Sequence, residues 1–542
     1  MESRCTGFLE SIRSRRPWPG LLLLLLALVL ILGNRAESAE ESPTFEIRSF
    51  IVEGNSLFPD KKINDILQPY KGPNRTAQGV ETARNALEKA YHDAGYPAVF
   101  VNIPEQTVQD GTVRLQVIES KIGKVRVTGN EWYTRSKILR DLPSLAPGKV
   151  LYVPLVQKDL ERINSGQDFK ASPVLSPGTE PGFTDVEIKV EDKLPLHGNL
   201  ELNNRSTHDT KDLRLNAMLR YDNLWQRDHS VSAQIQTSPE DTKEVRLYAL
   251  SYTLAAPWMA DHHIAVYGLR SDSNTTTFGQ GFLVTGKGTI FGIRYVVPLA
   301  PYEQYAHNIT LGFDYKDFQE TVGFNTPDTP AMKTPMTYAP LSFAYAASLP
   351  DPWGMTRFSS GLNMVFRGLV TDEREFEIKR YQAKGNYLYF TAGVERSQKL
   401  PAGMSLFVKV DGQIADQPLI SNEQYVAGGM ASVRGYKEAE ALGDNAFHAT
   451  VEISAPDMGP RLGLQGRAQL VPYVFFDYAW VQTIDVLPPT RETINLKGVG
   501  AGIRGTVYKN WYYEGSVGFP LANMDYTEKY RERWYFKAGI QF

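Results

Sequence analysis

The last ten residues of the chain, 533–542, alternate strictly between two kinds of side chain. Successive side chains of a strand point to opposite faces, so the sequence RWYFKAGIQF has one apolar face and one mainly polar face. The apolar face carries Trp534, Phe536, Ala538, Ile540 and Phe542. A strand that is apolar outside, polar inside and closed by an aromatic residue is typical of the end of an outer-membrane β-barrel. We therefore expect a barrel whose C-terminal assembly signal, Trp534, Phe536 and Phe542, is read by the barrel-assembly machinery.

The composition is consistent with a barrel and argues against two other classes of protein. The 542 residues carry a formal net charge of −3, which gives no reason to expect binding to nucleic acid. A helical membrane protein would contain several apolar runs of about 18 or more residues, whereas the one obvious run, 21–32, is shorter. The mean hydropathy is −0.32 although 11% of the residues are aromatic. A barrel reconciles these values because alternation hides its apolar band.

Residues 1–39 have the layout of a secretory signal peptide. Four arginines precede an apolar core and three small residues follow it: Arg4, Arg13, Arg15 and Arg16, then Ala36, Ser38 and Ala39. The segment that carries the arginines is long, so an uncleaved membrane anchor is the alternative. Cys5 is the only cysteine and precedes the apolar core. Cleavage would leave a mature chain without thiols, which excludes disulfides and cysteine catalysis.

Two segments repeat one another at a constant offset of 75 residues, VEGNSLFPDKKINDIL at 52–67 and VTGNEWYTRSKILRDL at 127–142. Fixed-period self-similarity indicates a duplicated structural unit. Each copy begins with an alternating strand that ends in a Gly-Asn pair, and continues with helical patterns and paired strands. The expected strands are 45–53, 98–103 and 113–118, then 124–128, 169–175 and 184–191. The expected helices are 60–67 and 77–94, then 136–142 and 154–164.

The order strand, helix, helix, strand, strand resembles that of the POTRA domain, a periplasmic module associated with polypeptide transport. The resemblance implies two small α+β domains, at 45–120 and 121–193. A domain of this kind offers a sheet edge and a helix groove, and an extended chain can bind there by strand addition. The alternative is a pair of spacer domains that contact no ligand.

Residues 196–542 contain only strand patterns. We count about sixteen segments of roughly ten residues, which start near 197, 213, 229, 244, 262, 285, 307, 337, 354, 385, 404, 446, 469, 495, 511 and 533. A soluble β-sandwich has the same alternation within each strand. The number of segments and the lengths of their connections therefore distinguish a barrel from a sandwich. An even number returns the C-terminus to the side from which the chain entered. Short turns, such as 223–228, alternate with the long loops 320–336, 369–384 and 416–445, as expected if the long loops face outward.

The longest loop contains the sequence AGGMASVRGYK at 427–437. Within it, Val433, Arg434, Gly435 and Tyr436 match the VRGY signature of the two-partner-secretion transporters (the TpsB family), which export large haemolysins and adhesins. The loop lies between the eleventh and twelfth segments, which is the position of the inward-folded sixth loop in that family.

A second motif supports the resemblance. Residues 475–479 read FFDYA and resemble the motif F-x-D-x-G on the thirteenth strand of that family, with Ala479 where the family usually has glycine. Alternation directs Phe475, Asp477 and Ala479 toward the lumen. The larger Ala479 leaves slightly less room for a close backbone approach.

The two motifs also predict a physical contact. An arginine on a flexible loop, beside a glycine, can fold into a wide barrel and meet a carboxylate on the wall. We expect such a contact to be partly desolvated, so that loss of one partner would cost about 1–3 kcal/mol. The family resemblance implies that Arg434 and Asp477 hold the loop in a secretion-competent position. The alternative is a solvated Arg434 and an Asp477 that is one polar lumen residue among many.

No motif in the sequence indicates catalysis or metal binding. His262 and His263 sit at a short turn without a partner at ligand spacing. Gly498, Gly500 and Gly502 share one face of a segment and are expected to leave room in the lumen rather than to bind a nucleotide. We therefore expect no enzymatic activity, no cofactor and no metal.

These features predict a mainly β protein of the bacterial outer membrane, with a 16-stranded transmembrane barrel and two periplasmic POTRA-like domains. We expect it to bind an unfolded partner exoprotein of the haemolysin or adhesin type in the periplasm and to export it through the barrel. Its other expected partners are outer-membrane lipid and the barrel-assembly machinery. Two alternatives remain, an outer-membrane assembly factor that inserts barrels and a plain porin.

Overall fold

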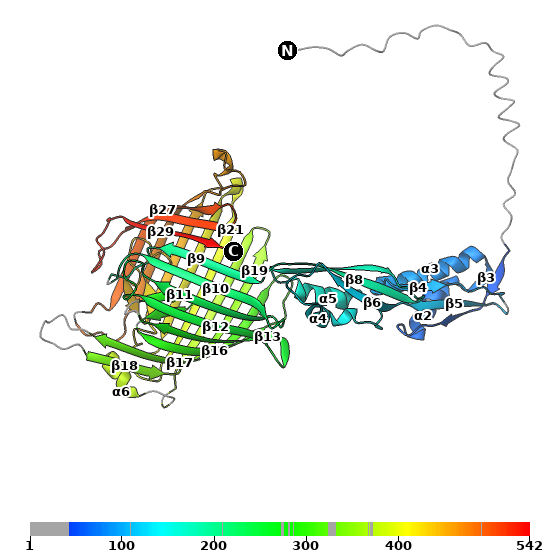
Figure 1. Cartoon of the computed structure of the whole chain (residues 1–542), viewed down its shortest axis with the longest axis horizontal. Helices are drawn as coiled ribbons and strands as arrows, with labels where there is room; N and C mark the ends of the chain where they lie inside the picture. The colour runs from blue at the N-terminus through cyan, green and yellow to red at the C-terminus, as the bar shows by residue number, and fades with distance from the viewer. Residues whose placement is uncertain are drawn as a thin grey trace, which may run out of the picture. The chain divides into compact units, whose positions relative to one another are not determined.

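The computed structural model describes residues 43–542 apart from 109, 209, 273–275, 280–281, 286, 323–331, 367, 369–371 and 489. The predicted signal peptide, 1–39, lies outside the described residues, as does Cys5. The chain divides into two compact units, Met1–Gly129 with Ile138–Glu191 and Asn130–Lys137 with Asp192–Phe542, and we describe each by itself (Figure 1). Every helix within the described residues is too short or too polar to cross a membrane.

The N-terminal part contains two three-stranded sheets of the same topology, each with a central strand that is parallel to one neighbour. In the order edge, centre, edge, their strands are β2 (Ser49–Glu53), β5 (Thr112–Glu119) and β4 (Val99–Asn102), then β6 (Lys121–Thr128), β8 (Phe183–Asp192) and β7 (Phe169–Pro177). Two helices follow the first strand of each sheet: α2 (Asp60–Leu67) and α3 (Ala77–Asp93), then α4 (Arg135–Asp141) and α5 (Val153–Ile163). The second copy has the predicted order of strand, helix, helix, strand and strand, and the first copy has the same order with additional short strands.

The repeated Gly-Asn pair has the same structural role in both copies. Gly54 has φ +81 and Gly129 has φ +83, a left-handed conformation that favours glycine. A β-carbon would lie 2.3 Å from the carbonyl oxygen of Val117 in the first copy and 2.4 Å from that of Val190 in the second. The asparagine that follows each glycine donates its side-chain amide to a carbonyl three residues on, at 2.7 and 2.8 Å. The repeat in sequence is therefore a repeat of one tight turn.

The helices of the first copy bury one apolar stripe against its sheet. In α3 the buried side chains are Val80, Ala83, Leu87 and Tyr91, spaced three or four residues apart as on one face of a helix. They pack with α2 and with the inward side chains of β5 in one hydrophobic core. The expected strand 45–53 is interrupted, and its first part, β1 (Phe45–Ile47), pairs with β3 (Gly72–Arg75). The sequence GPNR of β3 indicates a turn, so that strand was not predicted.

The second unit is a closed β-barrel in which, among the described residues, sixteen strands span the wall. In chain order they are β9 (Leu196–Asn203), β10 (Arg214–Leu224), β11 (His229–Thr237), β12 (Arg246–Ala256), β13 (Met259–Ser271), β16 (Gly288–Pro298), β17 (Ala306–Val322), β18 (Met332–Tyr338) continued by β19 (Leu341–Asp351), β20 (Gly354–Met364), β21 (Leu388–Lys399), β22 (Ser405–Ala415), β25 (Asn445–Ser454), β26 (Val471–Gln482), β27 (Thr493–Val507), β28 (Trp511–Pro520) and β29 (Arg533–Gln541). Because β18 and β19 pair with the same strand, β17, they form one span. The predicted 16-stranded barrel is confirmed.

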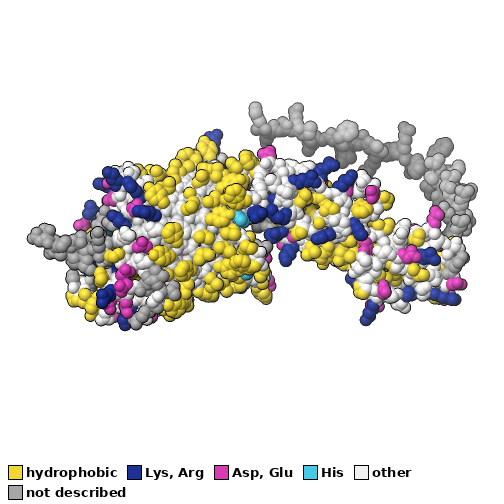
Figure 2. All heavy atoms as spheres, turned by 60° about the horizontal axis from the view of Figure 1, so that its bottom comes forward, with side chains coloured by type: hydrophobic (Ala, Val, Ile, Leu, Met, Phe, Trp, Pro, Cys, Tyr) yellow, Lys and Arg dark blue, Asp and Glu magenta, His cyan; other side chains and the backbone are white. Residues whose placement is uncertain are grey.

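The wall of the barrel is apolar outside, as the alternation predicts. On β26, the outward side chains of Val474 and Phe476 are 54% and 44% exposed. The alternate side chains of Phe475 and Asp477 point inward and are 5% and 0% exposed. Hydrophobic side chains cover the outer surface of the strands in a broad band, and charged side chains gather at one end of the barrel (Figure 2). A strand that alternates in this way can face lipid on one side and a polar interior on the other.

Three segments that were expected to be long loops contain secondary structure. In the segment 320–336, β17 continues to Val322 and β18 begins at Met332. The segment 369–384 contains the short helix α6 (Glu373–Lys379). The segment 416–445 contains a small hairpin of β23 (Tyr425–Ala427) and β24 (Ala441–Gly443).

The barrel closes where the last strand, β29, meets the first, β9. The ladder between them runs from Lys537↔Asn203 to Gln541↔Asn199, five residue pairs, whereas β26 and β27 share twelve. The terminal Phe542 extends this seam through backbone hydrogen bonds in both directions with Gly198, at 3.0 and 3.1 Å. A β-carbon on Gly198 would lie 2.2 Å from the Phe542 ring. The ring therefore occupies the space that the glycine leaves.

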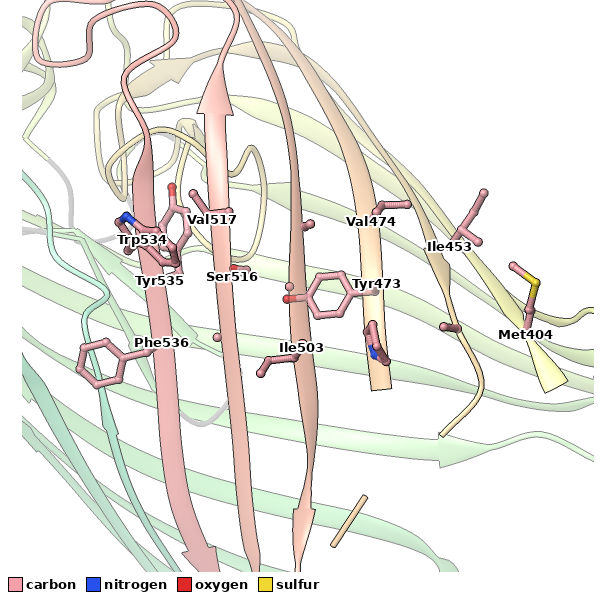
Figure 3. Close-up of a pocket in the computed structure, with 15 residues that line it drawn as sticks. Met404, Ile453, Tyr473, Val474, Ile503, Ser516, Val517, Trp534, Tyr535 and Phe536 are labelled. Atoms are coloured by element: carbon pink, nitrogen blue, oxygen red, sulfur yellow. The ribbon is translucent and has the colours of Figure 1, made fainter. Parts of the chain in front are cut away.

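The other two residues of the predicted C-terminal signal face outward on β29. Trp534 and Phe536 are 67% and 37% exposed. Together with outward side chains of the preceding strands, such as Ile503 and Val474, they line an apolar recess of about 830 Å³ (Figure 3). An apolar recess on the outer wall is compatible with contact to lipid. Recognition of this strand by the assembly machinery stays a prediction.

The Gly198–Phe542 contact generates a test of the seam. In Gly198→Ala the added β-carbon would displace the Phe542 ring, and we expect the barrel to be destabilised by about 1–3 kcal/mol because overpacking forces neighbours to shift. The measurement is the midpoint temperature at which the folded barrel loses its fast migration in a gel. Gly515→Ala is the matched control, because a β-carbon there has nothing within 4 Å. Equal midpoints for the two variants would contradict this account of the seam.

Candidate functional site

The candidate site lies where the loop between β22 and β25, residues 416–444, meets the inner wall of the barrel. We refer to this segment as the lumen loop. Val433 and Tyr436 are fully buried at 0% exposed and Arg434 is 6% exposed. Their partners are inward side chains and backbone groups of β25 to β29. The loop is thus packed against the wall rather than solvated.

Arg434 forms the central contact with the wall. Its Nε and Nη2 donate to the two carboxylate oxygens of Asp477 on β26, at 2.8 and 2.9 Å. Its Nη1 donates to Glu452 Oε2 on β25 at 2.9 Å, and its backbone N–H donates to Asp477 Oδ2 at 3.0 Å. Because both sides of the guanidinium are paired with carboxylates, the contact fixes the direction of the loop as well as its position.

The charges around this contact balance. Arg504 on β27 lies 2.7 Å from Glu452 Oε1, so two guanidinium groups meet two carboxylates. The ring of Phe475 lies under the Arg434 guanidinium, 3.4 Å from ring centroid to Cζ, which adds a cation–π contact. Asp477 is 0% exposed, so the expectation of a partly desolvated contact is wrong. Removal of one partner from a fully buried pair costs about 3–5 kcal/mol because the other charge stays behind.

The residues next to Arg434 hold the loop backbone. Gly435 has φ +107, where only glycine is unstrained, and its N–H donates to the hydroxyl of Tyr535 at 2.8 Å. That hydroxyl donates to the carbonyl of Tyr436 at 2.5 Å. The Tyr436 hydroxyl in turn donates to the carbonyl of Lys497 at 3.1 Å. Arg434, Gly435 and Tyr436 therefore each have a defined hydrogen-bond partner on the wall.

Val433 and Tyr436 also share a small hydrophobic cluster with inward side chains of the neighbouring strands, which include Ala479, Val481 and Leu496. Ala479, where the related motif usually has glycine, is 0% exposed in this cluster. Its methyl group is accommodated by apolar contacts, so the difference from the motif does not prevent the loop from docking.

Glycines on the wall let the loop backbone approach closely. A β-carbon on Gly498 of β27 would lie 1.9 Å from the carbonyl oxygen of Arg434, and one on Gly518 of β28 would lie 2.6 Å from the amide nitrogen of Gly435. The expectation that Gly498 leaves room in the lumen now has a physical reason, since the room is occupied by the loop. Gly500 and Gly502 make space for rings of the wall itself, Phe475 and Tyr473.

The structure brings six of the nominated site residues into one cluster: Val433, Arg434, Gly435, Tyr436, Phe475 and Asp477. Trp534, Phe536 and Phe542 lie on the outer wall and at the seam instead. Sequence reasoning missed Glu452, Arg504 and Tyr535. Glu452 faces Phe475 in the register of β25 and β26, a pairing that could be found only by aligning adjacent strands. His262, weighed as a metal ligand, lies on the wall with Nδ1 2.6 Å from the hydroxyl of Tyr295.

The close approach at Gly498 generates a test of docking. Gly498→Ala should push the loop off the wall although Arg434 and Asp477 are unchanged, because a β-carbon cannot fit 1.9 Å from a carbonyl oxygen. We expect a cost of about 1–3 kcal/mol, which raises the undocked population by about one order of magnitude. The rate of tryptic cleavage after Arg434 or Lys437 in the purified barrel reports that population. Gly515→Ala is the control, and equal protection in both variants would contradict docking through Gly498.

Two family models match parts of the chain. Residues 45–120 match the family model "POTRA domain, ShlB-type", and residues 342–505 match "Haemolysin secretion/activation protein ShlB/FhaC/HecB". The second match includes the whole of the lumen loop and the strands that carry Glu452 and Asp477, β25 and β26, and it ends within β27.

Two curated relatives and one solved structure extend the comparison. The chain is 20% identical over 484 residues to the heme/hemopexin transporter protein HuxB of Haemophilus influenzae (strain 86-028NP), covering 86% of this chain and 82% of the relative. It is 19% identical over 446 residues to the outer membrane transporter CdiB of Dickeya dadantii (strain 3937), covering 78% and 74%. Its fold is similar to that of CdiB from Escherichia coli, with a TM-score of 0.62, 17% identity and coverage of 96% and 97%. Two regions of the chain are thus similar to the POTRA domain and to the secretion/activation domain of the two-partner-secretion transporters, and the protein lies in the bacterial outer membrane, with its barrel in that membrane and its N-terminal POTRA domains in the periplasm.

Proposed function

We propose that this transporter binds an unfolded partner exoprotein of the haemolysin or adhesin type in the periplasm and exports it through its own barrel. The observation that carries the proposal is the buried pair of Arg434 and Asp477. The pair joins a loop to the wall, whereas a pair that served only the stability of the barrel would join two strands. In this proposal the pair holds the lumen loop in the position from which secretion starts.

The docked loop is suited to a movement between two arrangements. Its contacts with the wall are ion pairs, hydrogen bonds and a small apolar cluster. When the loop leaves as a unit, water can replace the polar contacts, so the cost is smaller than that of deleting one charge. A segment with two discrete positions is a recurrent element of switching proteins.

The interior beside the loop has the polarity that a passing chain requires. A cavity of about 380 Å³ is lined mainly by polar and charged side chains of the wall and of the lumen loop. Positive groups, Lys316 and Lys409, and negative groups, Glu423 and Glu438, both contribute to this lining. A mixed lining of this kind offers no continuous apolar surface on which an unfolded chain would be retained.

The N-terminal sheets offer places for capture of an extended chain. β4 and β7 are edge strands of their sheets, and each carries exposed apolar side chains, Phe100 at 52% on β4 and Val174 and Leu175 at 41% and 45% on β7. Unpaired edge strands bind extended chains through main-chain hydrogen bonds, and apolar side chains add affinity. We propose that these edges bind the exoprotein.

The alternative is an outer-membrane assembly factor that inserts other barrels. Export is favoured because the family model that matches residues 342–505 describes haemolysin secretion and activation, and because relatives that align with most of the chain bear the name of transporters. A plain porin does not require the lumen loop to be fixed by a buried ion pair.

A paired quantitative proteome separates export from assembly. The culture supernatant and surface fraction are compared with the outer membrane, with and without this gene in its own host. We expect one large exoprotein to disappear from the outside while other barrels keep their levels. A broad fall in many outer-membrane barrels would instead identify an assembly factor.

The same proteome tests the role of the ion pair. Asp477→Arg places two positive charges together in a buried site, so we expect the loop to undock and secretion to fall by at least two orders of magnitude, with a folded barrel. Asp314→Asn is the control, because Asp314 pairs with Arg294 at 2.6 Å between two strands of the wall. Undiminished secretion by Asp477→Arg would overturn the proposed role of the pair.

A further inference from the structure

We propose that Glu423 is a second anchor of the lumen loop, a positioning residue that holds the first half of the loop against a different sector of the wall from the one that binds Arg434. The inference rests on the proposed function in one respect, namely that the loop moves during export. Its consequence is that release of Arg434 alone leaves part of the loop in the lumen.

The carboxylate of Glu423 meets three strands. Oε1 accepts hydrogen bonds from Lys316 Nζ on β17 at 2.6 Å and from the Tyr338 hydroxyl on β18 at 2.5 Å. Oε2 accepts from the Tyr389 hydroxyl on β21 at 2.9 Å. The Glu423 side chain is 3% exposed. One cationic and two hydroxyl donors satisfy the hydrogen-bonding capacity of this buried carboxylate, and they fix the orientation of the side chain.

The two anchors lie in different parts of the wall. In the order of strands around the barrel, β17, β18 and β21 precede β22, whereas the partners of Arg434 are on β25 and β26. Ten residues of the loop, 424–433, lie between position 423 and position 434. Loss of the Arg434 contacts therefore weakens the attachment of the second half of the loop without any direct effect on the partners of Glu423.

An apolar cluster surrounds the first half of the loop. Leu419 and Ile420 are 0% and 1% exposed, and they pack in a cluster with Tyr338, Tyr387 and Phe376 of α6. Barrel interiors of this width are generally polar. The first half of the loop is therefore buried in apolar packing, and Glu423 adds a charged contact with the wall at that place.

A further buried carboxylate fixes the base of the loop. Asp444 is 0% exposed and pairs with Arg380, which follows α6, through two contacts at 2.6 and 2.7 Å. It also accepts from the backbone N–H of Leu419 at 2.9 Å. Asp444 directly precedes β25 and Leu419 follows the end of β22 by four residues, so the contacts of Asp444 with Arg380 and Leu419 hold the two ends of the loop together. Glu423 lies further into the loop, where a contact decides how much of it stays in the lumen.

The test uses the purified full-length protein in planar lipid bilayers and measures the fraction of time that the pore conducts. Glu423→Gln keeps the shape of the side chain and can still accept from one of the two tyrosines, but it removes the charge that pairs with Lys316. We expect the conducting fraction to rise about tenfold, within the range typical of coupled sites. The charge exchange Lys316→Glu with Glu423→Lys should return it toward the wild-type value. Asp314→Asn removes a wall-to-wall ion pair of equal length and should leave it unchanged.

Asp477→Asn separates this inference from the proposed function. If the two anchors act independently, Glu423→Gln and Asp477→Asn should each raise the conducting fraction, and the combination should exceed both. A rise with Asp477→Asn alone would overturn the second anchor and leave the role of Arg434 intact. No rise with either variant would contradict both.

Retention of the folded form in unheated gels verifies that each barrel has assembled. Tyr389→Phe, which deletes one hydrogen bond, is the milder variant should Glu423→Gln fail to fold. If Tyr389→Phe conducts like Asp314→Asn, the inference is wrong.

Discussion

A carboxylate buried in the wall of the barrel, Asp477, constrains the structure around it. A charge that is removed from water must be paired, and its partner comes from a loop rather than from a neighbouring strand. The other features of the site follow from this requirement. Arg434 needs a second carboxylate for its remaining donors, its backbone must lie against the wall, and the wall must be glycine where that backbone passes.

The arrangement explains why the signature residues differ in chemistry. Arg434 supplies charge, Gly435 supplies a backbone conformation closed to other residues, and Val433 and Tyr436 supply apolar contact with the wall. The combination gives a loop with a defined docked position and polar contacts that water can replace.

Much of the fold could be predicted from the sequence because its signals are local. A period of two identifies the strands. The turns at Gly54 and Gly129 both require glycine, because a β-carbon at either position would clash with a carbonyl oxygen. The contact partners of Arg434 could be predicted only in part. Asp477 belongs to a motif, whereas Glu452, Arg504 and Tyr535 come from other strands, and their proximity depends on the register around the barrel. Glu423 had no local signal at all, because a glutamate in a loop is ordinarily solvated.

The central claim is that an exoprotein passes through the lumen beside the displaced loop. Site-specific photo-crosslinking to a stalled exoprotein, identified by the proteome comparison, tests it most directly. The crosslinker is placed at Thr391, which lines the polar cavity, and at Phe390, which is 45% exposed on the outer wall of the same strand. The account predicts adducts from Thr391 and none from Phe390. Adducts from Phe390 alone, while secretion proceeds, would contradict passage through the lumen.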